Sequence, residues 1–118
     1  LADILLLRAE AYNQAGDLAN AANLANQVRA RVQLPPVSPN SKDAMEAAIL
    51  NERRLELAFE GKRWFDLVRT GNAVSVMNAQ KDGNGNNLNY NVQPYMLVYP
   101  IPQTQLDLNP LLTQNQGY

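Results

Sequence analysis

The chain has no cysteine and no histidine among its 118 residues. These two absences exclude disulfide bonds, thiolate zinc sites, thiol nucleophiles and imidazole general bases. A formal net charge of −1 creates no long-range field that would attract nucleic acid, so we expect no nucleic-acid partner. No apolar run approaches the roughly 20 residues that a membrane-spanning helix needs. The composition predicts one globular domain of modest size, residues 1–118.

What the chain does contain is a strongly charged segment that also carries aromatic rings. Residues 51–69 hold nine of the 21 formal charges, together with Phe59, Phe65 and the only tryptophan, Trp64. A helical segment with this many rings cannot be an ordinary solvated face. We therefore expect either ion pairs around a buried seam or a surface for a partner. Trp64 follows a helix break, a position that favours a place in the core.

Two stretches near the start show helical periodicity. Apolar residues recur at helix spacing over residues 2–15 and again over residues 18–32. Between them, Gly16 supplies a positive φ and Asp17 supplies an N-cap acceptor. Alanines on the second stripe permit a close approach of the first helix. The pattern predicts an antiparallel helical hairpin over residues 1–33.

The remainder of the chain reads as shorter pieces. Three prolines within residues 35–39 predict a rigid extended crossing. A cap at Asn40 or Ser41 begins a third predicted helix, which continues through Leu55 and Phe59 to Gly61. We then expect a fourth helix over residues 63–70, a weak fifth helix over 73–80 and a turn over 81–87. Extended chain follows over residues 90–99, and one helical turn over 103–106. These pieces make up the predicted signature helices, residues 41–80, and the C-terminal segment, residues 81–118.

The predicted fold class is all-α, with tetratricopeptide-like hairpin packing and an irregular C-terminal segment packed on the helices. Tyr12, Gly16 and Ala21 stand at the offsets that tetratricopeptide hairpins use for a ring, a turn and a small contact residue. Ala25 replaces the aromatic residue expected in the second helix, and no regular 34-residue period is present. Leucines of the tail are apolar enough to pack on the helices.

The hairpin leaves two functional interpretations open. It is either a packing unit within a larger helical domain or a protein–protein interaction module that binds a partner through its groove. The second interpretation treats Asn13 and Asn20 as exposed residues of the groove.

A row of acidic residues runs along the charged segment. Glu52, Glu56 and Glu60 repeat every four positions, and like charges at that spacing cost about 0.2–0.5 kcal/mol per pair in an isolated helix. We expect arginines to offset this cost, with Arg53 meeting Glu56 or Glu60. Further arginine candidates are Arg63, Arg8, Arg29 and Arg31. The alternative, a carboxylate pair that performs hydrolysis or binds a metal, has no histidine to complete it.

Two further patterns have both a structural and a functional interpretation. Residues 82–86 resemble the start of a calcium-binding loop, but Asn87 and Gln93 replace the glycine and glutamate that such a loop needs, so we expect a tight turn. The tyrosines around the Asn/Gly turn are expected to be exposed, whereas Tyr118 of the tail is apolar enough to pack on the helices. The alternative for the aromatic residues is stacking on sugar rings, with the candidates Trp64, Tyr90, Tyr95, Tyr99 and Tyr118.

Residues 52–69, Glu-Arg-Arg-Leu-Glu-Leu-Ala-Phe-Glu-Gly-Lys-Arg-Trp-Phe-Asp-Leu-Val-Arg, resemble the signature helix of the SusD/RagB family. Residues 2–11 are similar to the helix that opens this region of the family, and residues 100–102 and 109–118 to its closing segment. Gln116 departs from the pattern, because proline is common there. The matched signature positions, carried over as packing and ion-pair residues, are Glu52, Arg53, Arg54, Glu56, Phe59, Glu60, Gly61, Arg63, Trp64 and Asp66.

The resemblance implies a binding protein and not an enzyme, with no cofactor and no metal. Members of the family are lipid-anchored on the outer face of the outer membrane, where they capture glycans or peptides beside a SusC-like TonB-dependent transporter. Their fold is almost wholly helical. By resemblance we expect this chain to be the C-terminal part of a longer protein that contacts the membrane through an anchor outside it. No ligand-binding residue is carried over.

Overall fold

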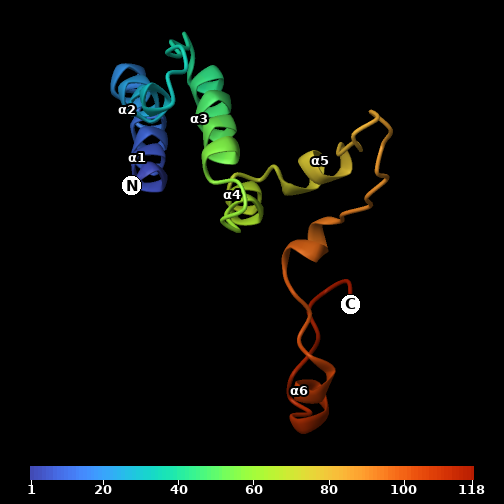
Figure 1. Cartoon of the computed structure of the whole chain (residues 1–118). Coiled ribbons are helices and arrows are strands. Elements are labelled where there is room, and N and C mark those ends of the chain that lie inside the picture. Colours follow the sequence, from blue (N-terminus) through green and yellow to red (C-terminus); the bar gives the residue numbers. More distant parts are fainter. The chain divides into compact units, whose positions relative to one another are not determined.

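A computed structural model describes residues 1–118 and contains α-helices and one 3-10 turn, with no strand (Figure 1). The elements are α1 (Ala2–Gln14), α2 (Leu18–Arg31), α3 (Lys42–Glu56), α4 (Arg63–Arg69), α5 (Ala73–Asn78), η1 (Pro94–Leu97) and α6 (Gln103–Leu108). The predicted all-α class is confirmed. None of these helices combines the length and the apolar character needed to cross a bilayer.

The contacts of the chain gather into two compact units, Leu1–Asp66 and Leu67–Tyr118. The first contains α1, α2, α3 and the beginning of α4, and the second contains the remaining elements. The expectation of one domain over residues 1–118 stays a prediction.

The helical hairpin of the first unit forms where the sequence predicts it. Gly16 adopts φ +85°, and the side chain of Asp17 accepts a hydrogen bond from the backbone N–H of Asn20 at 3.1 Å. The Asn20 side chain also donates to Asp17 at 2.6 Å. Two adjacent residues therefore end one helix and begin the next.

We expect Gly16→Ala to lower the free energy of unfolding by about 1–2 kcal/mol, because an L residue with a Cβ is strained at positive φ. No atom lies close enough to clash with the new methyl group, so the loss reports backbone strain alone. Gly16→Asn is the matched variant, since asparagine tolerates this conformation better. Urea unfolding curves that show equal losses for the two variants would contradict the explanation.

The core of the first unit lies between the hairpin and α3. Small alanines of α1 and α2 are buried in the same cluster as larger side chains from all three helices, which allows the helices to pack closely. The buried cluster consists of Leu6, Ala9, Ala21, Leu24, Ala25, Val28, Met45 and Ile49. The predicted packing of the alanine stripe is confirmed.

Asn13 is fully buried, so its expected place on an exposed groove is wrong. It lies one turn beyond Ala9 on the buried stripe of α1, and its Nδ2 donates to the backbone oxygen of Lys42 at 3.0 Å. This bond fixes the start of α3 against the hairpin. Asn20 is exposed, as expected, but its side chain serves the cap of α2.

Asn26 of α2 makes two hydrogen bonds to the proline-rich crossing. Asn26 donates to the backbone oxygen of Val37 at 2.9 Å and accepts from its N–H at 2.8 Å. The side-chain amide thus pairs with the crossing as a neighbouring strand would. This arrangement agrees with the prediction of extended chain, which then enters α3 through the cap at Ser41.

α3 ends at Glu56, five residues before the predicted end at Gly61. Leu57 caps the helix and is buried, while Phe59 adopts φ +67° and is fully exposed. Leu55 is also exposed, because the buried face of α3 carries Met45 and Ile49 instead. The helix predicted beyond Glu56 and the packing role carried over for Phe59 are therefore wrong.

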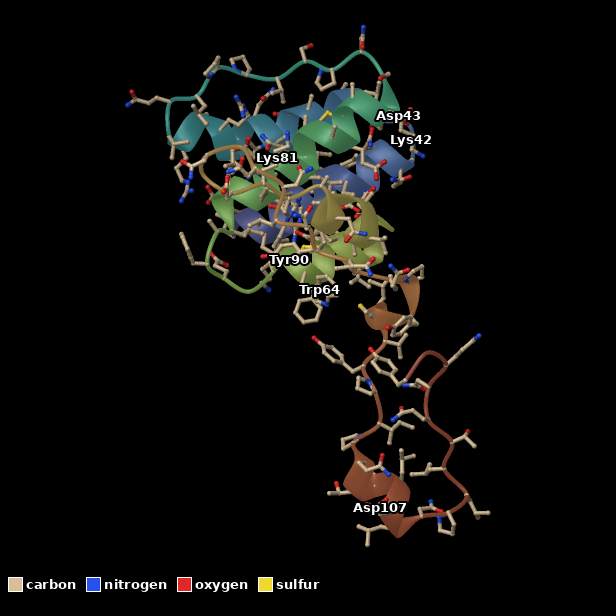
Figure 2. All side chains as sticks on the ribbon, turned by 90° about the vertical axis from the view of Figure 1, so that its right-hand side faces the viewer. Lys42, Asp43, Trp64, Lys81, Tyr90 and Asp107 are labelled. Atoms are coloured by element: carbon tan, nitrogen blue, oxygen red, sulfur yellow. The ribbon has the colours of Figure 1, made fainter.

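The second unit consists of short helices joined by turns. α5 agrees with its prediction, and the helical turn expected at 103–106 is the longer α6. The interval expected to be extended, 90–99, contains η1, which Pro94 begins. Figure 2 shows the segment before α6 beside the segment that follows it, and Figure 1 shows the same arrangement. Leu108 and Leu111 are exposed, and the packing of the tail on the helices stays a prediction.

Candidate functional site

Two arginines at the end of α2 pair with the acidic face of α3. Arg29 Nη1 lies 2.6 Å from Glu52 Oε2, and both side chains are largely buried. Arg31 forms a salt bridge with Glu56 one turn further along α3. Arg29 also donates from Nε to the backbone oxygen of Pro35 at 2.8 Å, which ties the crossing into the same cluster. The expected pairing of Arg29 and Arg31 with the acidic row is confirmed.

Arg53 forms the centre of a second cluster, with only 4% of the residue exposed. Its Nε donates to Asp66 Oδ2 at 2.8 Å, and its Nη2 lies 2.8 Å from Asp3 Oδ1. Nη1 also donates to the backbone oxygen of Asp3 at 3.3 Å. Lys62 Nζ lies 3.4 Å from the other oxygen of Asp3. One guanidinium therefore joins the beginning of α1, the end of α3 and α4.

Three expectations about pairing are wrong. Arg53 pairs with Asp66 and Asp3, and not with Glu56 or Glu60. The reason is that α3 ends early, so that α4 folds back and places Asp66 next to Arg53. Glu60 lies beyond the helix and is exposed, so it leaves the row that Glu52 and Glu56 share. Arg8 donates to the Tyr12 hydroxyl at 3.1 Å and covers its ring, away from the acidic row.

The Arg53 guanidinium, which is hydrogen-bonded to Asp3, holds the pKa of that carboxyl group below its ordinary value of 3.8. Partial burial of Asp3 acts in the opposite direction, and Lys62 adds to the lowering. The folded state therefore favours the ionised form of the Asp3 carboxyl group. A salt bridge in this position also places a carboxylate at the N-terminus of α1, where the helix dipole favours it.

We expect Asp3→Asn to make the stability of the chain less sensitive to acid. A carboxyl group with a lowered pKa in the folded state contributes stability that is present above 3.8 and is lost as the pH falls through the folded pKa. Urea unfolding midpoints between about pH 7 and pH 3 will therefore fall less steeply in the variant. Asp43→Asn is the control, because Asp43 is exposed in the first turn of α3. Parallel curves for wild type and Asp3→Asn would refute the assignment.

The end of α3, the beginning of α4 and the residues between them line a recess of about 300 Å³. Trp64 lines it and is half-buried, so its predicted place as a core residue is not met in full (Figure 2 labels this residue). Phe65 is exposed on α4. The signature positions that share the recess are Arg53, Arg54, Phe59, Gly61, Arg63, Trp64 and Asp66. These positions therefore lie together around one recess, and the structural role carried over for them stays a prediction.

The Asp82 loop is the tight turn that the sequence predicts. The Asp82 carboxylate accepts hydrogen bonds from the backbone N–H groups of Asn84 and Asn86, each at 2.8 Å, and from the Asn86 side chain at 3.1 Å. These bonds, led by those of Asn86, lower the pKa of Asp82. The carboxylate is engaged by its own loop, which is an arrangement for a turn.

A larger cavity, of about 570 Å³, lies within the second unit. It is lined by residues 93–95, Val98 and residues 115–117. Tyr95 and Tyr118 meet beside it edge to face, with ring centres 5.2 Å apart. All four tyrosines of this half are exposed, as expected for those around the Asn/Gly turn. Sequence reasoning missed that residues near 95 and 118 come together, although a glycine at position 117 beside Tyr118 was a signal of close approach.

The sequence model of the SusD family matches residues 1–118. The chain belongs to the SusD family. Among curated relatives, it is 44% identical over 126 residues to SusD-like protein P38 of Formosa agariphila, with 99% of this chain and 23% of that protein covered. It is 32% identical over 120 residues to the starch-binding protein SusD of Bacteroides thetaiotaomicron, with 100% and 20% covered.

Solved structures of the SusD superfamily share the fold of this SusD-family chain. One from Bacteroides vulgatus superposes with a TM-score of 0.83 at 33% identity, covering 99% of this chain and 26% of that one. Another, a SusD-like protein from Bacteroides fragilis, gives a TM-score of 0.81 at 25% identity, with 99% and 25% covered. The resemblance stated from the signature segment is confirmed, as is the tetratricopeptide-like helical class. The chain spans about a quarter or less of the length of these relatives.

Proposed function

We propose that residues 1–118 form the C-terminal part of a longer, non-catalytic SusD-like protein that captures glycan nutrients at the outer-membrane surface. The observation that carries the proposal is the family match over the whole chain, together with likeness to a relative named for starch binding. Peptides are the alternative ligand class of the proposal. The protein works beside a SusC-like TonB-dependent transporter and contacts the membrane through a lipid anchor outside this chain.

The geometry of the first unit supports a role without catalysis. The carboxylates that a glycoside hydrolase would need are engaged by guanidinium groups, Glu52 by Arg29 and Glu56 by Arg31. An acid–base pair in such an enzyme must reach the glycosidic bond of the substrate. Glu52 and Glu56 instead contact guanidinium groups of α2, which supports a structural role for both side chains.

The proposal is tested by purifying the intact protein from outer membranes and by screening it on an array of glycans and peptides. We expect a SusC-like transporter to co-purify and at least one glycan to bind without being cleaved. The Glu56→Gln variant is expected to retain binding. Recovery without any outer-membrane transporter, or turnover of a glycoside that Glu56→Gln abolishes, would overturn the proposal.

A further inference from the structure

The cavity of the second unit has walls that the chain holds in place. Tyr118 donates from its hydroxyl to the backbone oxygen of Val98 at 2.9 Å, and Asn115 Nδ2 donates to the backbone oxygen of Tyr99 at 2.7 Å. Gln114 pairs with both backbone groups of Ile101, at 2.8 and 2.9 Å. The last five residues are thereby fixed against the segment 98–101.

The hydrogen bonds between residues 114–118 and 98–101 form a clasp. Tyr95 lies between this clasp and the cavity. Its ring meets Tyr118 at an interplanar angle of 87°. It also lies so close to Gly117 that a Cβ added there would stand 2.4 Å from Cγ of Tyr95. Tyr95 remains 37% exposed and lines the cavity. One side of the tyrosine is therefore fixed by protein, while part of its surface is available to a ligand at little further entropic cost.

The lining of the cavity carries no charged side chain. Its polar side chains are the amides of Gln93, Asn115 and Gln116 and the phenol of Tyr95, which combine donors and acceptors. Pro94 and Val98 supply apolar surface. A volume of about 570 Å³ falls within the roughly 300–1,000 Å³ that small-molecule sites occupy.

We propose that this cavity is a subsite for a neutral saccharide, with Tyr95 as the stacking platform and Gln93 and Gln116 as partners of the sugar hydroxyls. A pyranose ring has an apolar C–H face for the aromatic ring and a rim of neutral hydroxyl groups for the amides. An acidic or sulfated sugar would leave its charge unpaired here, because no lining side chain is cationic. The inference rests on the proposed function. It specifies where on the chain a glycan binds and which class of sugar is bound.

The test uses the intact protein that contains this chain and compares four variants by isothermal titration calorimetry. Tyr95→Ala removes the platform and Tyr95→Phe keeps it. Gln116→Trp fills the cavity without deleting a packing contact, since Gln116 is exposed. Tyr99→Ala is the matched control, because Tyr99 is a neighbouring tyrosine that is 78% exposed and lies outside the cavity lining.

The probes are neutral hexasaccharides (malto-, laminari-, manno- and xylohexaose), an alginate hexamer and a tryptic digest of casein. For the neutral sugar that binds, we expect Tyr95→Ala and Gln116→Trp each to weaken affinity by about tenfold or more, and Tyr95→Phe by less than about threefold. Tyr99→Ala is expected to leave affinity unchanged. Circular dichroism melts identify any variant that fails to fold.

The outcomes separate this inference from the proposed function. If a neutral sugar binds with equal affinity to wild type, Tyr95→Ala and Gln116→Trp, the subsite is wrong and glycan capture stands. If the alginate or the casein peptides bind through the cavity instead, the assignment to neutral saccharides is overturned. If none of the neutral sugars binds, the subsite fails, and the recovery of the transporter then decides the proposed function independently.

Discussion

We expect Arg53→Ala to lower the free energy of unfolding of the first unit by about 3–5 kcal/mol. The substitution removes the guanidinium that contacts both Asp3 and Asp66, while the Asp66 side chain remains buried. A buried charge that loses the guanidinium hydrogen-bonded to it keeps its desolvation penalty and loses the attraction that this guanidinium supplied. Because whole domains are stable by only about 5–15 kcal/mol, this loss is a large part of the total.

Urea unfolding followed by circular dichroism measures the effect, with Arg54→Ala as the matched control. Arg54 is the next residue along α3, but it is exposed and donates a hydrogen bond to the side chain of Asn51 at 3.3 Å. We expect the control to change the free energy of unfolding by less than about 0.5 kcal/mol. Arg53→Lys should fall between the two, since it keeps the charge and loses the planar fork. Equal losses for Arg53→Ala and Arg54→Ala would show that the cluster adds nothing to stability.

Local signals explain why the hairpin was predictable from the sequence. Gly16 and Asp17 act on the backbone within one turn, and apolar spacing assigns each neighbouring residue to a face. The cap at Ser41 and the proline-rich crossing are local in the same sense. Each of these predictions needed only interactions between residues that are close in the chain, and each agrees with the structure.

Ion-pair partners were less predictable, because charge alone does not choose among several arginines. The partner of Glu52 lies 23 residues away and the second partner of Arg53 lies 50 residues away in the sequence. Spacing on α3 favoured Arg53 with Glu56, whereas the fold places Asp66 in reach instead. The partner of Arg53 is decided by the fact that α3 ends at Glu56. No glycine or proline marks this end in the sequence. It follows from the burial of Leu57 and the return of α4, which are tertiary effects.

The cavity of the second unit was the least predictable feature. Exposed tyrosines were expected, but their pairing depends on a clasp between residues 98–101 and 114–118 that has no periodic pattern. Side-chain amides make this clasp, and a sequence with many asparagines and glutamines offers many equivalent pairings. The family match assigned the fold, and the structure was needed to bring the lining residues of this cavity together.

We expect Leu6→Ala to lower the free energy of unfolding by about 2–5 kcal/mol, comparable with the loss at Arg53. Leu6 is 0% exposed and is among the largest fully buried side chains, in a cluster to which α1, α2 and α3 all contribute. The cluster around Leu6 includes several alanines. Their side chains are too short to move into the space that the substitution leaves. The cavity left behind therefore collapses poorly, and such cavities carry the higher costs.

Leu7→Ala tests whether the loss comes from the cavity and not from a change in helix propensity. Leu7 is the next residue on α1, makes the same change in propensity and is 39% exposed, so its expected loss is about 1 kcal/mol or less. Both variants are measured by urea unfolding, with the slope of the transition checked for change. Leu6→Ala and Arg53→Ala act on different contacts, one apolar and one ionic, so their losses should add in the double variant. A loss at Leu6 no larger than the loss at Leu7 would mean that the three helices do not share the core described for the first unit.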